Sequence, residues 1–277
     1  MKKPVLLLIA LLVLGTVAAF LYTQLNPQVS LNQVGNQLYV YDENTNTGDS
    51  AFSNKITSPT PSVTVNEEKV VDPANLDPAL FVMDITNKYL KLPVGRKLIY
   101  EGQTEDGLEK VEITIPGDRK LIIGVNTLVY VDKVWVDAEL VESTKDYLAQ
   151  DINGNVWYFG EDVDNYEDGV LKDHEGAWLA GVNGAQPGIW IKAEEKVGDK
   201  YRQEYAKDVA EDSREILAVN QKVTIGLGTY NDCVKTYDWT PLDPEANEHK
   251  FYCSEVGALV KEIDLTNNDN IELKSAN

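Results

Sequence analysis

The residues best suited to contact a ligand are tryptophans set among glycines. Trp178 and Trp190 lie near the ends of the stretch 176–190. Three glycines lie between them: Gly181, Gly184 and Gly188. Glycine lets the backbone approach a neighbour closely, and tryptophan offers a flat, largely apolar contact surface. The pattern predicts one of two structures. The stretch is either a loop over a cavity also lined by Trp157 and Phe159, or a connection that fills one end of the domain with its own aromatics.

Arg202 is a further candidate for ligand contact, and it is one of four arginines in the chain. Arg202 and Glu204 are two positions apart in a probable strand, Tyr201 to Tyr205, so they are expected on one face. An inward-facing arginine needs a partner. It would either bind an anionic group of a ligand or form a structural ion pair with Glu211 or Asp212.

An acidic stretch offers weak candidates for a metal site, namely Glu161, Asp162 and Asp164. Carboxylates are the ligands that Ca²⁺ prefers, and an exported protein meets it at high concentration. The spacing lacks the glycine and the closing glutamate of an EF-hand loop. The alternatives are a solvated acidic hairpin or a carboxylate pair of an extracellular hydrolase. The sequence predicts no other cofactor.

Templates for catalysis are mostly missing from the sequence, which has no nucleophile elbow, no zinc-protease motif and no phosphate-binding loop. His174 and His249 are the two histidines that could act as a base. The chain has 45 acidic against 25 basic residues and a net charge of −20. Such a charge argues against binding to nucleic acid and to anionic membrane surfaces. The sequence therefore favours a protein that is not an enzyme.

The composition of the first 76 residues predicts a targeting segment followed by a linker. Lys2 and Lys3 precede an apolar run from Val5 to Tyr22, which predicts a signal peptide or an N-terminal membrane anchor over 1–25. Either would place the rest of the chain outside the cytoplasm, secreted, periplasmic or tethered, with membrane contact through this segment alone. Residues 26–76 are rich in Asn, Ser, Thr and Pro and predict a flexible linker.

A β-rich domain is predicted over 77–265, followed by a polar tail over 266–277. Val111, Ile113 and Ile115 alternate with polar residues, as in a half-buried strand. Similar strands recur at short intervals, with at most one short helix around Leu80–Tyr89. The connections are too short for helical crossovers. We expect an all-β fold made of a single antiparallel, mostly meandering sheet, strongly curved or barrel-like and analogous to the lipocalins. A β-sandwich is the alternative.

Two cysteines, Cys233 and Cys253, predict a disulfide. If the strands on either side of a loop at 241–247 form a hairpin centred on Asp243, the two cysteines lie directly opposite each other. Opposite residues on an antiparallel pair are close enough for a disulfide, and an exported protein can keep one. Two separate buried thiols are the alternative.

Several stretches resemble an uncharacterised family of exported bacterial proteins. They are Ile85–Gly95, Ile99–Gly102, Asp151–Asp162, Gly176–Gly188, Tyr201–Tyr205, Ala210–Asp212 and Trp239–Leu242. The resemblance covers about residues 80–262 and implies an exported β-rich domain without implying a reaction. Lys88 and Cys253 depart from the family, which usually has proline and alanine at these places.

Three functions are compatible with these observations. The favoured one is an extracytoplasmic binding protein that holds a small apolar or amphipathic ligand in a barrel cavity. The second is a structural or interaction module that binds a component of the cell envelope. The third is an extracellular hydrolase that uses a carboxylate pair such as Glu161 and Asp162. The sequence leaves the oligomeric state open.

Overall fold

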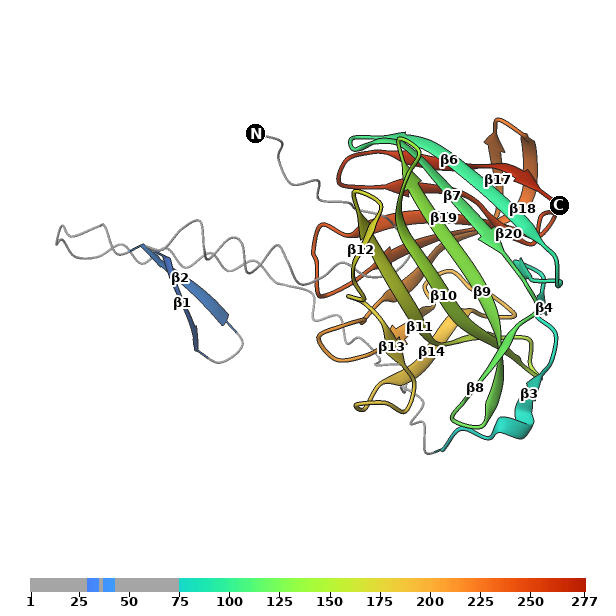
Figure 1. The fold of residues 1–277 in the computed structure, drawn as a ribbon, viewed down its shortest axis with the longest axis horizontal. Helices are drawn as coiled ribbons and strands as arrows, with labels where there is room; N and C mark the ends of the chain where they lie inside the picture. Colours follow the sequence, from blue (N-terminus) through green and yellow to red (C-terminus); the bar gives the residue numbers. More distant parts are fainter. Residues whose placement is uncertain (1–28, 35–36, 43–74) are drawn as a thin grey trace. The chain divides into compact units, whose positions relative to one another are not determined.

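The computed structural model describes residues 29–34, 37–42 and 75–277 (Figure 1). In the first two ranges, β1 (Val29–Val34) pairs with β2 (Gln37–Asp42) as an antiparallel hairpin. The expected signal peptide or anchor over 1–25 lies outside the described residues. Most of the expected linker over 26–76 also lies outside them, and the described part of it is this hairpin together with residues 75–76. Within the described ranges, no helix has the length and apolar character needed to cross a membrane.

The chain from residue 75 onward is built from antiparallel strands, with a short 3-10 helix at Pro78–Leu80. The short helix considered around Leu80–Tyr89 does not form, because that range contains two short strands, Phe81–Val82 and Thr86–Asn87. The strands are β3 (Phe81–Val82), β4 (Thr86–Asn87), β5 (Leu90–Lys91), β6 (Lys97–Thr104), β7 (Gly107–Thr114), β8 (Arg119–Ile122), β9 (Val125–Val136), β10 (Glu139–Asp151), β11 (Val156–Glu167), β12 (Val170–Asp173), β13 (Trp178–Leu179), β14 (Gln186–Ile191), β15 (Lys200–Arg202), β16 (Glu204–Tyr205), β17 (Ser213–Ile225), β18 (Gly228–Trp239), β19 (Asn247–Cys253), β20 (Ala258–Asp264) and β21 (Asn270–Ala276).

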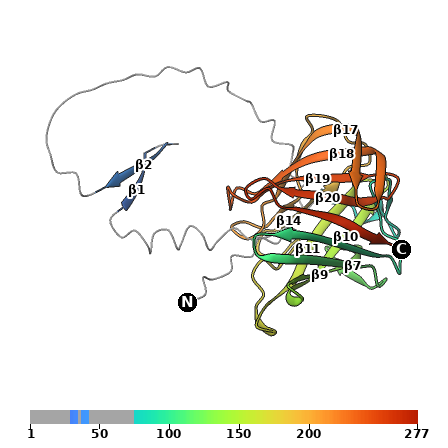
Figure 2. The same cartoon turned by 90° about the horizontal axis from the view of Figure 1, so that it is seen from above.

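Apart from β4 and β5, which pair only with each other, these strands form one large sheet that curls into a nearly closed barrel with one seam. Neighbours along the chain mostly pair with each other, from β9 to β11 and again from β17 to β21. β21 then pairs with β6, and β6 with β7. Figures 1 and 2 show the green strands β9 and β10 in one wall and the orange-to-red strands β17–β20 in the opposite wall. The expected meandering, barrel-like all-β fold is confirmed.

Alternating side chains determine which face of each strand turns inward. Val111 and Ile113 of β7 and the following Ile115 are buried, whereas Glu112 and Thr114 between them are half-exposed. Successive side chains of a strand point to opposite faces, so the apolar set fills the barrel. The core also includes Leu98, Leu128, Leu148, Ile216, Val234, Val260 and Leu273.

The seam lies where the short segment 200–205 joins two walls. Its first half, β15, pairs with β17, and its second half, β16, pairs with β14. The segment changes partner at Gln203, whose N–H donates to the carbonyl of Asp212 at 2.8 Å. Gly188 of β14 lies against this segment so closely that a Cβ there would stand 2.3 Å from the carbonyl oxygen of Gln203. A glycine is therefore needed at this position.

A hairpin made by β4 and β5 covers one end of the barrel. Tyr89, Leu90 and Leu92 of this segment are buried in the core. The Asn87 side-chain amide donates to the carbonyls of Gly154, at 2.8 Å, and Lys192, at 3.0 Å. The Arg96 guanidinium donates to the carbonyls of Val256 and Gly257, both at 2.8 Å. These bonds tie the segment 85–96, here called the cap, to the turns at that end.

The stretch 266–277 is not the polar tail that its composition predicted. Its residues 270–276 form β21, which pairs with β20 on one side and with β6 on the other. Leu273 points inward and is fully buried, while Glu272 on the outer face binds Lys261. The side chains on the outer face of β21 contact solvent and are therefore polar. The composition of the stretch is for this reason polar even though β21 completes the barrel wall.

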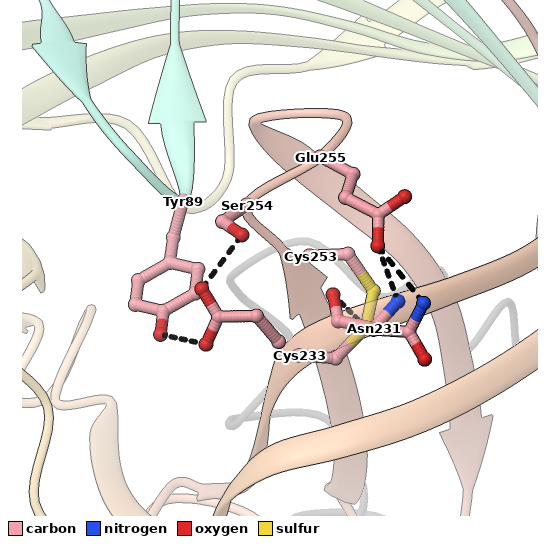
Figure 3. Close-up of a disulfide and its surroundings, with 7 residues drawn as sticks. Tyr89, Asn231, Cys233, Cys253, Ser254 and Glu255 are labelled. Carbon is pink, nitrogen blue, oxygen red and sulfur yellow. Dashed lines mark hydrogen bonds between the residues drawn. A yellow bond between two sulfur atoms is a disulfide. The ribbon is translucent and has the colours of Figure 1, made fainter.

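The predicted disulfide between Cys233 and Cys253 is confirmed. The two residues lie directly opposite each other on β18 and β19, in the register expected for a hairpin centred on Asp243. Figure 3 shows the bond beside a small polar network. In this network the Ser254 hydroxyl donates to Asp232 at 2.8 Å, and the Tyr89 hydroxyl of the cap donates to Asp232 at 3.3 Å. The disulfide thus lies near the contact between wall and cap.

Removing this disulfide is expected to lower the free energy of unfolding by about 3 kcal/mol, because the bond closes a loop of 20 residues in the unfolded chain. Urea unfolding of the protein with Cys233→Ser and Cys253→Ser together measures the loss. A reducing agent should destabilise the wild type by a similar amount and leave the double variant unchanged. Equal midpoints for oxidised and reduced wild type would refute the prediction.

Candidate functional site

The interior of the barrel has a polar half beside its apolar half. Its inward-facing carboxylates are buried: Glu109, Asp132, Asp146, Glu161, Glu204, Asp238, Glu248 and Glu262. Among the described residues, the cations buried with them are Arg214 on β17 and Lys250 on β19. Arg96, also buried, binds backbone carbonyls in the cap. Acidic side chains therefore outnumber basic ones inside the barrel.

Arg214 forms the most extensive polar contacts of the interior, and its side chain is 1% exposed. Its Nε donates to Asp238 Oδ1 at 2.8 Å, and its Nη2 donates to Asp238 Oδ2 at 2.5 Å. The same guanidinium donates to the Tyr252 hydroxyl at 3.1 Å and to the carbonyl of Trp190 at 2.5 Å. Because Trp190 is on β14, across the seam from β17, the arginine joins the two sides of the seam.

Lys250 is shared among three acids, one on its own strand β19 and one on each neighbouring strand. Its Nζ lies 2.8 Å from Glu248 Oε2, 3.6 Å from Glu262 Oε2 and 3.8 Å from Asp238 Oδ2. Arg214 and Lys250 both lie on the wall formed by β17–β19. The cations are thus collected on one wall and lie next to acids of that same wall.

Two carboxylates near the seam have no comparable partner. Glu161 of β11 is 1% exposed and Glu204 of β16 is fully buried. In the described part of the chain, no hydrogen bond of normal geometry reaches their four carboxylate oxygens, although Tyr158 lies close to Glu161, and Trp178 lies close to Glu204. The nearby Tyr158 hydroxyl donates its proton to Asp146 Oδ1, at 2.6 Å, and not to Glu161. Burial, and next the charge of Glu204, raises the pKa of Glu161 well above its ordinary value.

Aromatic rings lie next to this carboxylate pair. Tyr158 contacts Trp178 edge-on, with ring centres 5.4 Å apart, and Trp190 edge-on at 5.0 Å. Tyr130 packs against Trp190 at 5.9 Å. Trp178 is the register partner of Glu161 on the adjacent strand β13. The arrangement brings unpaired carboxylates and aromatic faces together, which is the chemistry that binds an organic cation.

The five residues predicted to line a ligand cavity lie in three places. Trp178 and Trp190 point into the barrel and pack on Tyr158, as described above. Trp157 and Phe159 lie elsewhere and contact the Phe81 ring of β3, with ring centres 6.0 and 5.5 Å away. The structure therefore brings two of the four predicted aromatics together with Glu161, and the other two stabilise the contact with β3.

Arg202 lies outside the barrel, although an inward-facing arginine was considered. It is exposed and stacks on the Tyr205 ring, 4.5 Å from its centre. Glu204 is nevertheless buried, so the expectation that the two side chains share a face is wrong. Regular alternation fails because the chain changes partner strands at Gln203. The buried arginine is instead Arg214, which sequence reasoning missed.

The three weak metal candidates do not point to one place. Glu161 faces the interior. Asp162 is on the outside, where it binds Lys120 Nζ at 3.0 Å and accepts a hydrogen bond from Tyr147. Asp164 lies 2.9 Å from His174 Nδ1. Within the described ranges, no group of three His, Cys, Asp or Glu side chains has an arrangement that could hold a metal ion. The pair Glu161 and Asp162 is also split between the two faces of β11.

Replacing Arg214 by leucine is expected to lower the free energy of unfolding by about 3–5 kcal/mol, because the change leaves the buried Asp238 without its main partner. Adding Asp238→Leu should recover part of the loss. Arg202→Leu is the matched control, since this exposed arginine lies opposite Ser213, next to Arg214, and should cost about 1 kcal/mol or less. Chemical denaturation measures all three. Equal losses for the two arginine variants would contradict the role given to Arg214.

The buried carboxylates predict that stability falls as the pH rises from 5 to 8. Burial raises the pKa of Glu109 to about 8, and those of Asp146 and Asp212 to about 7. These groups ionise near pH 4 in the unfolded chain, so the folded protein binds more protons over this range. Each contributes a loss of about 1.4 kcal/mol per pH unit until its folded pKa is reached.

Thermal unfolding at pH 5, 6, 7 and 8 checks this pH dependence. The midpoint should be highest at pH 5, and Glu109→Gln should make the decline shallower. Glu139→Gln, which removes the same charge from an exposed position, should leave the decline unchanged. A midpoint that rises toward pH 8 would refute the raised pKa values.

Comparison with known proteins finds no matching family model, no matching curated protein and no matching solved structure. The resemblance of Ile85–Gly95 and the other stretches to exported bacterial proteins therefore stays a prediction. The geometry of the chain itself carries the functional argument: a nearly closed barrel whose seam holds buried, unpaired carboxylates next to aromatic rings.

Proposed function

We propose that this chain is an extracytoplasmic binding protein that holds a small amphipathic ligand in its barrel. The polar end of the ligand is a cation that pairs with Glu161 and Glu204. The observation that carries this proposal is the burial of both carboxylates, whose oxygens receive no hydrogen bond of normal geometry in the described part of the chain. A buried carboxylate without a partner lowers stability, and an ammonium group would neutralise it and donate hydrogen bonds.

The aromatic surroundings support a ligand with an apolar portion. Tyr158 and Trp178 lie beside the carboxylates, and Trp190 packs on the Tyr158 ring. Aromatic faces attract ammonium groups and also cover alkyl or aryl carbon. A hydrophobic amine fits both properties, whereas a purely apolar ligand would leave the carboxylates unpaired.

An extracytoplasmic location agrees with the apolar run from Val5 to Tyr22 and with the disulfide between Cys233 and Cys253. We place the protein outside the cytoplasmic membrane, either secreted or tethered by its N-terminal segment.

Titration of the full chain with phenethylamine tests the proposal. Calorimetry should show saturable binding that weakens at least about tenfold in Glu161→Gln and in Glu204→Gln, since each variant removes one charge partner. Asp162→Asn is the matched control, because this neighbouring acid lies on the outside of β11 and should leave the affinity unchanged. The isosteric neutral alcohol, 2-phenylethanol, should bind more weakly than the amine.

A structural module of the cell envelope is the second candidate. It is favoured by the close edge-on packing of Trp178 and Trp190 on Tyr158, which fills part of the interior with the chain's own rings. In that case phenethylamine shows no saturable binding to the wild type. The variants Glu161→Gln and Glu204→Gln are then more stable than the wild type. This outcome would overturn the binding proposal.

A further inference from the structure

A pocket lies at the end of the barrel opposite the cap. The turn between β6 and β7 and the turn between β20 and β21 form its rim. Six of its lining residues are acids: Glu105, Asp106, Glu109, Glu262, Asp264 and Asp269. The pocket is separate from Glu161 and Glu204, which do not line it.

Glu109 forms the floor of this pocket. Its side chain is 2% exposed, and it points inward from β7. Its Oε1 receives no hydrogen bond from any residue that the structure describes. Burial, and next the charge of Glu248, raises the pKa of Glu109 to about 8. The pocket therefore ends in a buried carboxyl oxygen to which no described residue donates a hydrogen bond.

Lys250 lies next to the pocket, but several acids already share its charge. Lys250 lies 3.6 Å from the pocket residue Glu262, but it is closer to Glu248, at 2.8 Å. In the described part of the chain, no lysine or arginine belongs to the pocket lining. A ligand that enters the pocket thus meets six acidic side chains and no basic one among the described lining residues.

The two turns of the rim are held in place by hydrogen bonds. The N–H of Glu105 donates to Asp269 Oδ2 at 2.9 Å, and the Asn267 amide donates to Glu105 Oε1 at 3.2 Å. Asp264 Oδ1 accepts from the N–H groups of Thr266 and Asn267 at 2.6 and 3.0 Å. The acceptors around the pocket are therefore organised before a ligand arrives.

The arrangement of these oxygens favours an ammonium group over a metal ion. Calcium needs six to eight oxygens at about 2.3–2.6 Å, and no three described acids converge in that way. An ammonium group has three donors that can each reach a different oxygen at hydrogen-bond distance. Charge-assisted bonds of this kind are short and strong in a partly buried site.

We propose that this pocket binds the ammonium group of a primary amine, with Glu109 as the buried acceptor and Asp106 and Asp269 at the rim. This site is independent of the ligand proposed for Glu161 and Glu204. A free polyamine and a lysine side chain of a peptide carry the same chemistry, and the experiment distinguishes them.

Titrating the full chain with spermidine, at an ionic strength of about 0.15 M to screen diffuse attraction, tests the proposal. Glu109→Gln should weaken saturable binding at least about tenfold, and Asp269→Asn should weaken it less. Glu139→Gln is the matched control, because it removes an exposed charge on β10 at the same end of the barrel. A blocked trilysine peptide is titrated in parallel, and tighter binding of the peptide would assign the pocket to lysine side chains.

The pH dependence gives a second readout that does not require a variant. Amine binding favours the ionised form of Glu109, so affinity should rise from pH 6 to pH 8.5. The groups that face Glu109 from the surrounding elements are Asp106, Asp132, Glu142, Glu248, Lys250, Glu262 and Asp269. In Glu109→Gln the rise should be smaller. An affinity that falls with pH in the wild type would count against the assignment.

Three outcomes would overturn the proposal. Spermidine could bind wild type, Glu109→Gln and Glu139→Gln equally, which means diffuse attraction to an acidic surface. It could show no saturable binding to the wild type. Calcium could displace spermidine and bind more tightly, with the same dependence on Glu109, which makes the pocket a metal site. Glu109→Gln removes a buried charge and should fold, and Asp269→Asn provides the same comparison if it does not.

Discussion

The ion pair of Arg214 and Asp238 is the interaction on which the rest of the barrel depends. The sheet is nearly closed, and its weakest place is the seam between β14 and β17, bridged by the short segment 200–205. Arg214 contacts strands on both sides of this seam through Asp238 and the carbonyl of Trp190. A guanidinium suits this position because its planar fork can serve a carboxylate and other acceptors at once. Lysine could not make the same set of bonds.

Much of the fold follows from local sequence patterns. Alternation in Val111–Ile115 predicts an inward face because strand geometry leaves two directions for side chains. The register of Cys233 and Cys253 follows from the loop that joins their strands, because a hairpin fixes the pairing on both sides of its turn. Short connections exclude helical crossovers and so predict a meander. These features depend on neighbours in the chain, and a single sequence carries that information.

The candidate site depends on interruptions of those patterns, which the sequence does not reveal. β11 contains an irregularity opposite Asp146–Leu148, and beyond it Glu161 turns inward. The change of partner at Gln203 buries Glu204 and leaves Arg202 outside. Arg214 lies in a strand whose charged residues look typical of a solvated face. In each case the direction of the side chain is set by pairing between segments far apart in the sequence, and the polar residue itself gives no sign of burial.

The cations of the interior lie on one wall, whereas acids lie on both walls. The cations Arg214 and Lys250 are on β17 and β19, whereas Glu109, Asp132 and Glu161 project from β7, β9 and β11. Replacing such acids by apolar side chains of similar volume would stabilise the free protein, and the other half of the same barrel already has an apolar filling. The unpaired acids therefore weaken the free barrel. A cation that binds the folded state alone would restore stability by mass action. The carboxylates that lower the stability of the free protein most are thus the ones through which a cationic ligand would stabilise the folded state.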